Sequence, residues 1–284
     1  MPLIRQSPLQ LYYDDTGQGE PVILLHGFTV NREYWHQSGL TERLATRYRV
    51  ITPDLRGHGD TRQTGYRHYY DVDTLAGDIG LLARHLKLQR FHLVGHSAGG
   101  MVAIRYAIEH SERLKSLTLI GTSAATIIGN AELGGYDQAR NQLADFYAGF
   151  DWSQIFNYLH HFPGPLLFRL DQMPNNALLW GKMERISRLN NPATLADFAR
   201  GFFTDPNPRL ARLRQIRCPT LVMYGEYDKL FVQSCEQLAR EIPDTRRVIQ
   251  PGIGHMNALE DPEGSASAIL AFLDSVGAKP ATPR

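Results

Sequence analysis

The residues best suited to chemistry lie in the run GHSAG at 95–99, where Ser97 stands between small residues. The run follows the apolar segment 91–94, which we predict to be a strand, and precedes 101–106, whose apolar spacing predicts a helix. A sharp turn from strand to helix holds its middle residue in a strained conformation and projects that side chain beyond the sheet. The N-terminal N–H groups of the helix then point to the same place. We therefore predict that Ser97 is a nucleophile.

A serine hydroxyl is a poor nucleophile near neutral pH, so it needs a base to take its proton and a third group to orient that base. His255 follows the predicted strand 247–249, and Asp228 follows the predicted strand 220–224. Both therefore lie just past the carboxyl ends of strands, at the same sheet edge as Ser97. We expect His255 to be the base and Asp228 to orient it. Glu226 is the alternative acid.

An acyl-transfer site also needs backbone N–H groups aimed at the developing oxyanion. The residue after the nucleophile, Ala98, supplies one of them. The run HGFT at 26–29 follows the predicted strand 22–25, and we expect Phe28 to supply the other. His26 is expected to brace this loop rather than to react. We also count His26 and His96 among the side chains next to the substrate.

The elements that position these residues alternate along the chain. Short apolar runs predict six buried strands, and amphipathic segments predict helices between them. The predicted strands are 22–25, 49–52, 91–94, 117–120, 220–224 and 247–249. Such alternation indicates βαβ units with a parallel sheet and helices on both faces. We also expect an antiparallel pair near 11–13.

The alternation stops between residues 123 and 210, where aromatic residues are frequent and no strand is apparent. A loop of that length is improbable in a compact domain. We therefore predict a helical cap insertion at 123–210 within a core domain formed by 1–122 and 211–284. Some of its aromatic residues should face the cleft beneath the cap. Our candidates for substrate contact are Tyr158, Phe162 and Trp180.

Composition narrows the possible partners. The 30 Lys and Arg residues balance 29 Asp and Glu residues, and this net charge of +1 argues against nucleic acid as the main partner. The chain shows no signal peptide and no apolar run long enough to span a membrane, so we expect a soluble, cytoplasmic protein that is a monomer or homodimer. Two cysteines are too few for a disulfide framework or a thiolate metal site. We expect no metal and no cofactor, and a small ester as the binding partner.

Five motifs together resemble the α/β-hydrolase fold family: HGF at 26–28, DLRGHGD at 54–60, GHSAGG at 95–100, GEYD at 225–228 and GIGH at 252–255. The resemblance covers residues 10–122 and 210–275. It implies a mostly parallel sheet of about eight strands, flanked by helices and carrying a helical lid. It also implies that Ser97, Asp228 and His255 form the catalytic set.

The residue at the nucleophile position separates branches of that family. Relatives that resemble haloalkane dehalogenases and epoxide hydrolases carry an aspartate where this chain has Ser97. Carbon–carbon bond hydrolases usually resemble G-N-S-x-G, whereas this chain has His96. We therefore expect hydrolysis of small, mainly apolar carboxylic esters, with lactones and thioesters included. The alternatives are a carbon–carbon bond hydrolase, a haloperoxidase or perhydrolase on the same triad, and a hydrolase-fold receptor with slow turnover.

Overall fold

The strands of the computed structural model form one sheet, whose order is β1-β2-β4-β3-β6-β7-β8-β9, with the short β5 paired to β2. The structure describes residues 2–64, 68–127, 135–207 and 209–277. The six strands from β4 to β9 in that order run parallel, and β1, β2 and β5 pair antiparallel. The strands are β1 (Leu3–Gln6), β2 (Leu9–Thr16), β3 (Glu20–Leu25), β4 (Tyr48–Pro53), β5 (Arg62–Gln63), β6 (Phe91–His96), β7 (Leu114–Ile120), β8 (Thr220–Gly225) and β9 (Thr245–Gln250).

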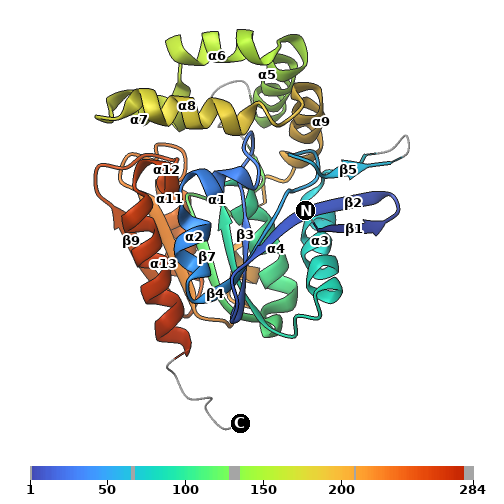
Figure 1. Cartoon of the computed structure of the whole chain (residues 1–284), viewed down its shortest axis with the longest axis vertical. Coiled ribbons are helices and arrows are strands. Elements are labelled where there is room, and N and C mark those ends of the chain that lie inside the picture. Colours follow the sequence, from blue (N-terminus) through green and yellow to red (C-terminus); the bar gives the residue numbers. More distant parts are fainter. Residues whose placement is uncertain (1, 65–67, 128–134, 208, 278–284) are drawn as a thin grey trace.

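Helices cover both faces of this sheet (Figure 1). Helices α3 and α4 pack together on one face, and α2 packs with α13 on the other. The core helices are α1 (Glu33–Gln37), α2 (Leu40–Ala45), α3 (Val72–His85), α4 (Ala98–His110), α10 (Leu210–Leu213), α11 (Val232–Glu241), α12 (Asn257–Glu260) and α13 (Pro262–Gly277), with a 3-10 turn at Ser111–Arg113. This arrangement confirms the predicted α/β class, and the six predicted strands lie within β3, β4, β6, β7, β8 and β9.

The central strands are apolar on both faces because helices cover both sides of the sheet. All four residues of 22–25 in β3 are fully buried, and every residue of β6 and β8 is buried. Local signals fix the helices between them. For example, the Asp71 side chain caps α3 by accepting a hydrogen bond from the Thr74 N–H at 2.9 Å. Such strands place their carboxyl ends at one rigid edge.

Five further helices lie between β7 and α10 and form a layer over that edge, at the top of Figure 1. They are α5 (Tyr136–Gly149), α6 (Trp152–His161), α7 (Gly164–Gln172), α8 (Asn176–Ser187) and α9 (Pro192–Phe202). The helical cap is thus present, although 128–134 and 208 of the predicted span 123–210 lie outside the described residues. The chain entering the cap and the chain leaving it pair at Thr126 and Asp205, whose backbone N–H and carbonyl groups exchange two hydrogen bonds.

No helix within the described ranges combines the length and the apolar character needed to cross a membrane.

Candidate active site

Ser97 lies at the turn between β6 and α4, in a conformation that few non-glycine residues adopt. Its φ is 53° and its ψ is −121°. The neighbouring glycines permit this turn, because a Cβ on Gly95 would lie 2.5 Å from the Gly99 carbonyl oxygen, and one on Gly99 would lie 2.5 Å from the His26 carbonyl oxygen. The strained turn is held by the Ser97 N–H, which donates to the Ile120 carbonyl at 2.9 Å. Strain of this kind is typical of functional sites.

His255 and Asp228 form a buried hydrogen-bonded pair. The distance from His255 Nδ1 to Asp228 Oδ2 is 2.8 Å, and neither residue is more than 2% exposed. An ionised carboxylate can only accept, so Nδ1 carries the proton and Nε2 is left as the basic nitrogen. The pair therefore fixes one tautomer and one orientation of the imidazole.

This pair lies close to the Ser97 turn. The His255 ring packs on the ring of His96, the residue before Ser97, with ring centroids 4.8 Å apart. Gly121 follows Ile120, and a Cβ placed on it would lie 3.2 Å from His255 Nδ1 and 2.7 Å from Asp228 Oδ2. In the part of the chain that the structure describes, no hydrogen bond joins the Ser97 hydroxyl to His255. Catalytic hydrogen bonds are often long without substrate and shorten when it binds.

Glu226, the alternative acid, has a different partner. Its carboxylate accepts a hydrogen bond from the Gly252 N–H at 2.8 Å, at the start of the loop that carries His255. Only Asp228 of the two acids is bonded to the imidazole.

A second carboxylate, which sequence reasoning missed, holds the histidine loop. Glu260 is buried, and its two oxygens accept hydrogen bonds from the N–H groups of Gly254 at 2.6 Å and Met256 at 2.9 Å. These two residues flank His255, so Glu260 fixes the backbone on both sides of it. Burial raises the pKa of Glu260. The run that follows the histidine, MNALED at 256–261, also holds Asn257 and Asp261, so the sequence alone does not single out Glu260 for this role.

The residues that carry the two predicted oxyanion donors lie at or beside the Ser97 turn. A Cβ on Gly27 would lie 3.0 Å from Ser97 Cβ, so the loop at 26–29 passes directly beside the nucleophile. Ala98 is the first residue of α4. Among the described residues, neither the Phe28 N–H nor the Ala98 N–H has a protein acceptor. Both N–H groups are thus free to bind an oxygen atom.

The histidines next to these elements are neutral and buried. The ring nitrogens of His26 bond to the Gly27 carbonyl at 2.8 Å and to the Leu55 N–H at 2.9 Å, so the ring joins two loops. Burial lowers the pKa of His26 far below its usual value. His96 bonds through Nε2 to the His255 carbonyl at 2.9 Å, and burial lowers its pKa to about 3. In these positions both rings brace loops of the site, and their expected contact with substrate stays a prediction.

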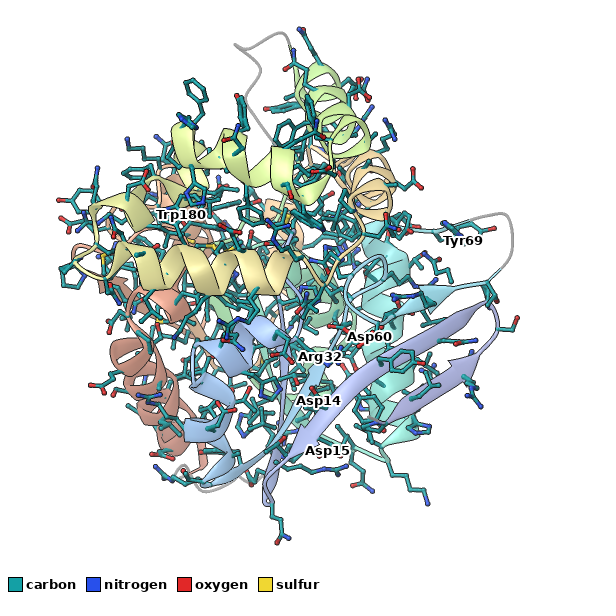
Figure 2. The ribbon with its side chains drawn as sticks, turned by 45° about the horizontal axis from the view of Figure 1, so that its top comes forward. Asp14, Asp15, Arg32, Asp60, Tyr69 and Trp180 are labelled. Atoms are coloured by element: carbon teal, nitrogen blue, oxygen red, sulfur yellow. The ribbon has the colours of Figure 1, made fainter. Side chains whose placement is uncertain are left out.

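The three aromatic side chains predicted to contact substrate make their ring contacts with other residues of the cap. Tyr158 lies on α6 and Phe162 directly follows that helix. They are 51% and 63% exposed, and their rings contact each other. Helix α6 is the outer layer of the cap, and α7 and α8 lie between it and the sheet (Figure 1). Trp180 is buried inside the cap (Figure 2), where its indole N–H donates to Asp171 at 2.6 Å. The structure therefore does not bring these three side chains to Ser97.

Three rings from the cap region meet the core at Phe28. Its ring stacks on Phe198 at a centroid distance of 5.6 Å, and it makes edge contacts with Tyr147 and Phe203 at 5.5 Å each. The sequence indicated aromatic residues in this insertion but did not show which helix faces would be turned inward.

The described residues contain no group of three or more His, Cys, Asp or Glu side chains that could hold a metal ion.

Comparisons with known proteins agree with the fold. A family model described as "alpha/beta hydrolase fold" matches residues 20–262. The chain is 27% identical to the non-heme haloperoxidase of Rhodococcus erythropolis, over 97% of this chain and 100% of that protein. It is 29% identical to a putative 2-succinyl-6-hydroxy-2,4-cyclohexadiene-1-carboxylate synthase of Bacillus subtilis (strain 168), over 90% and 91% of the two chains. A thermophilic esterase from Thermogutta terrifontis superposes with a TM-score of 0.79 at 28% identity, over 94% of each chain.

Proposed function

Because this chain belongs to the alpha/beta-hydrolase fold family, we propose that it is a cofactor-free serine hydrolase that cleaves small, mainly apolar carboxylic esters, lactones or thioesters. One observation carries the proposal. The His255–Asp228 pair lies against the strained Ser97 turn, beside two backbone N–H groups that have no protein acceptor among the described residues. This is the set of groups that acyl transfer through a serine requires.

In the first half of the reaction, His255 Nε2 takes the proton of Ser97 as Oγ attacks the carbonyl carbon. The electron pair of the carbonyl moves to its oxygen, and the N–H groups of Phe28 and Ala98 stabilise that oxyanion. His255 then gives the proton to the leaving alcohol as the carbon–oxygen bond breaks, which leaves an acyl group on Ser97. Asp228 stays ionised throughout and stabilises the imidazolium.

In the second half, His255 takes a proton from water as the water oxygen attacks the acyl carbon. The tetrahedral intermediate collapses, the bond to Ser97 Oγ breaks, and His255 returns the proton to the serine. The carboxylic acid leaves and the enzyme is restored.

The preference for apolar esters rests on the surroundings of Phe28. The rings of Tyr147, Phe198 and Phe203 gather around it, next to the loop that passes Ser97. Ser97 itself is only 9% exposed. A site walled by aromatic rings and closed to water favours an apolar acyl or alcohol group and strengthens the electrostatics of the oxyanion site.

The experiment that tests this proposal is the substitution Ser97→Ala. We expect kcat on p-nitrophenyl butyrate to fall by about 10³- to 10⁶-fold because the nucleophile is gone. The melting temperature should not fall, since the change removes a single oxygen atom at a strained turn. Ser123→Ala is the matched control, because its hydroxyl bonds only to the nearby Ala125 carbonyl among the described residues. Turnover by Ser97→Ala close to that of the unmodified protein would contradict the proposal.

A second activity on the same residues is favoured by the match to a haloperoxidase along nearly the whole chain. In that reaction hydrogen peroxide replaces water as the attacker of the acyl–Ser97 intermediate, and the product is a peracid that oxidises halide. A bromination assay with acetate, peroxide and bromide tests it. The Ser97→Ala variant should lose this activity together with ester hydrolysis.

A further inference from the structure

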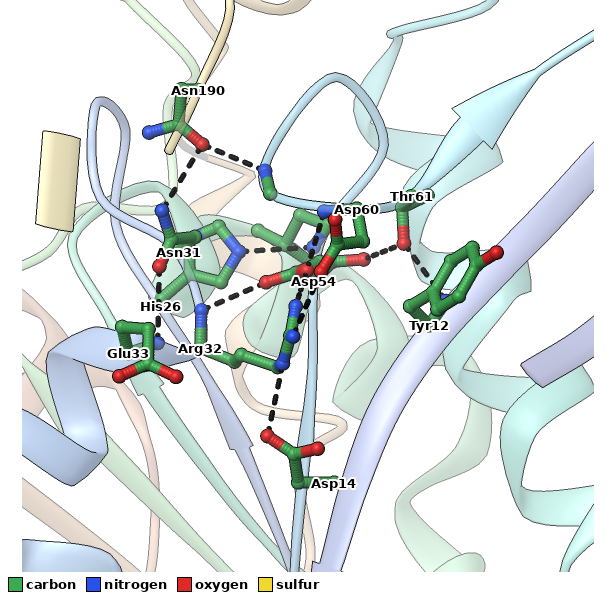
Figure 3. A network of polar contacts seen from close by, with 12 residues as sticks. Tyr12, Asp14, His26, Asn31, Arg32, Glu33, Asp54, Asp60, Thr61 and Asn190 are labelled. Carbon is green, nitrogen blue, oxygen red and sulfur yellow. Dashed lines mark hydrogen bonds and ion pairs between the residues drawn. The ribbon is translucent and has the colours of Figure 1, made fainter. Parts of the chain in front are cut away.

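Asn190 joins the cap to two loops of the core. It lies between α8 and α9, and it is buried at 5% exposure. Figure 3 shows its carboxamide pointing to the loop that contains Asn31 and to the loop that follows Asp54. The first of these loops continues directly from the HGFT run beside Ser97.

The Asn190 side chain forms hydrogen bonds with both of its polar atoms. Its Oδ1 accepts from the Gly59 N–H at 2.7 Å and from Asn31 Nδ2 at 3.3 Å. Its Nδ2 donates to the Thr29 carbonyl at 2.8 Å. The backbone carbonyl of Asn190 in turn accepts from the Trp152 indole at 2.8 Å, which fixes the segment to α6. One buried amide thus connects the cap, the Gly59 turn and the loop beside the nucleophile.

The hydrogen bond from Asn190 to the Thr29 carbonyl holds the turn next to the proposed oxyanion donor. Thr29 has a φ of 68°, a conformation that a β-branched residue adopts only when its surroundings hold it there. It directly follows Phe28, whose N–H is the proposed oxyanion donor. The direction of that N–H depends on the turn at 27–29. Asn190 holds this turn through its hydrogen bond to the Thr29 carbonyl.

We propose that Asn190 is a positioning residue that couples the seating of the cap to the formation of the oxyanion site. With the cap seated, its carboxamide holds the Thr29 turn, and the Phe28 N–H faces the position of the oxyanion. When the cap lifts, that hold is lost and the donor is no longer fixed. The inference rests on the proposed function, because it assigns a role to the Phe28 N–H.

Two substitutions of Asn190 test its hydrogen bonds to the Gly59 N–H and to the Thr29 carbonyl. Asn190→Asp keeps an acceptor for the Gly59 N–H but replaces the donor to Thr29 with an oxygen. Asn190→Ala removes both and buries no charge, so it tests the same point if the aspartate variant folds poorly. The matched control is Asn191→Ala, the next residue in the chain. The Asn191 side chain accepts a hydrogen bond from the Thr194 N–H at 3.2 Å at the start of α9. Its loss therefore weakens helix α9 but removes no bond to the Thr29 turn.

Activity is measured with p-nitrophenyl butyrate, and binding is measured with a trifluoromethyl ketone, which forms an oxyanion on the serine. We expect both Asn190 variants to lower kcat and to weaken ketone binding in parallel, by about 10- to 100-fold. Deletion of an oxyanion donor costs about 10²- to 10³-fold, and a misdirected donor should cost less. KM should change little.

Asn191→Ala should lower the melting temperature but leave kcat and ketone binding unchanged. The inference would be overturned if the Asn190 variants kept their kcat and their affinity for the ketone. It would also be overturned if Asn191→Ala lost as much affinity for the ketone as the Asn190 variants do.

Amide hydrogen exchange of the peptide covering 26–31 provides a readout that needs no turnover. Exchange there should be faster in Asn190→Ala than in the unmodified protein or in Asn191→Ala. Unchanged exchange would contradict the coupling. If the unmodified protein hydrolyses no ester and Ser97 cannot be acylated, the proposed function fails, while the exchange result still decides whether Asn190 holds the loop.

Discussion

Asp228 and Glu226 are two residues apart, but only Asp228 bonds to the imidazole of His255. Glu226 bonds to the Gly252 backbone instead. Two acids in one loop left the assignment open in the sequence, because spacing does not tell which carboxylate points inward. Burial separates them, since Asp228 is fully buried and Glu226 is exposed.

Replacement of this carboxylate tests its role. We expect Asp228→Asn to lower kcat by about 10⁴-fold, because an amide can favour the wrong tautomer of the histidine and cannot stabilise the imidazolium. Glu226→Gln is the matched control and should retain kcat within the same order of magnitude. The measurement is steady-state hydrolysis of p-nitrophenyl butyrate by both variants. A larger loss in Glu226→Gln than in Asp228→Asn would reverse the assignment.

The sequence could predict that Ser97, Asp228 and His255 lie at one edge of the sheet, because each follows the end of a predicted strand. The same was not possible for Glu260, for Asn190 or for Arg169, whose Nε donates to the Gly252 carbonyl. Their roles depend on backbone groups that only the folded chain brings near, and a side chain that binds a distant carbonyl or N–H leaves no pattern of residue types. These three residues support the loops of the site rather than supply its reacting atoms.

At the scale of elements, the sheet was predictable and the packing of the cap was not. Buried parallel strands have continuous apolar runs with clear ends, so the common edge could be located from the sequence. Cap helices carry aromatic residues on more than one face. In the sequence, the exposed rings of Tyr158 on α6 and of Phe162 just after it could therefore not be told from the inner ring of Phe198 on α9.

Helix α7 of the cap holds the histidine loop through Arg169. Its Nε donates to the Gly252 carbonyl at 2.6 Å, and its guanidinium lies 5.1 Å from the centre of the Tyr227 ring. Removal of this contact should let the loop that carries His255 shift. We expect Arg169→Met to lower kcat/KM by about tenfold, since small misplacements of reacting groups have large effects on rate.

The matched control for this contact is Arg188→Met. Arg188 also lies over an aromatic ring, that of Phe156 at 5.5 Å, and it bonds to Glu184 within α8. Both partners belong to the cap. Its replacement should leave kcat/KM nearly unchanged, and equal losses in the two arginine variants would show that α7 has no special role.

For the molecule as a whole, several buried histidines link stability to pH. Burial lowers the pKa of His58 to about 4, whereas a histidine in the unfolded chain titrates near 6.5. Between these values the unfolded chain binds the additional proton. The contribution of His58 to stability is therefore present above pH 6.5 and is lost as the pH falls toward 4. The contribution of Asp54 to stability changes with pH in the opposite direction. Burial raises the pKa of Asp54 to about 6, so the folded chain binds the additional proton and this contribution grows as the pH falls.

Comparison of the unmodified protein with a His58 variant separates the contribution of this histidine from that of groups such as Asp54. We expect the free energy of unfolding of the unmodified protein, minus that of His58→Gln, to fall by about 1.4 kcal/mol per pH unit between about pH 6 and pH 4.5. Urea titrations across this range measure it. His161→Gln is the control because that ring is exposed to water. A pH-independent difference for His58→Gln would refute a buried neutral histidine at this position.

The proposed mechanism requires an acyl group to be carried on Ser97. The most direct measurement is rapid quenching of the protein with p-nitrophenyl butyrate, followed by intact mass and peptide mapping. We expect a transient butyryl adduct on the peptide that contains Ser97. This adduct should be absent from Ser97→Ala and should form far more slowly in His255→Gln. Ester hydrolysis without an adduct on Ser97, or with the adduct on another residue, would contradict the proposed mechanism.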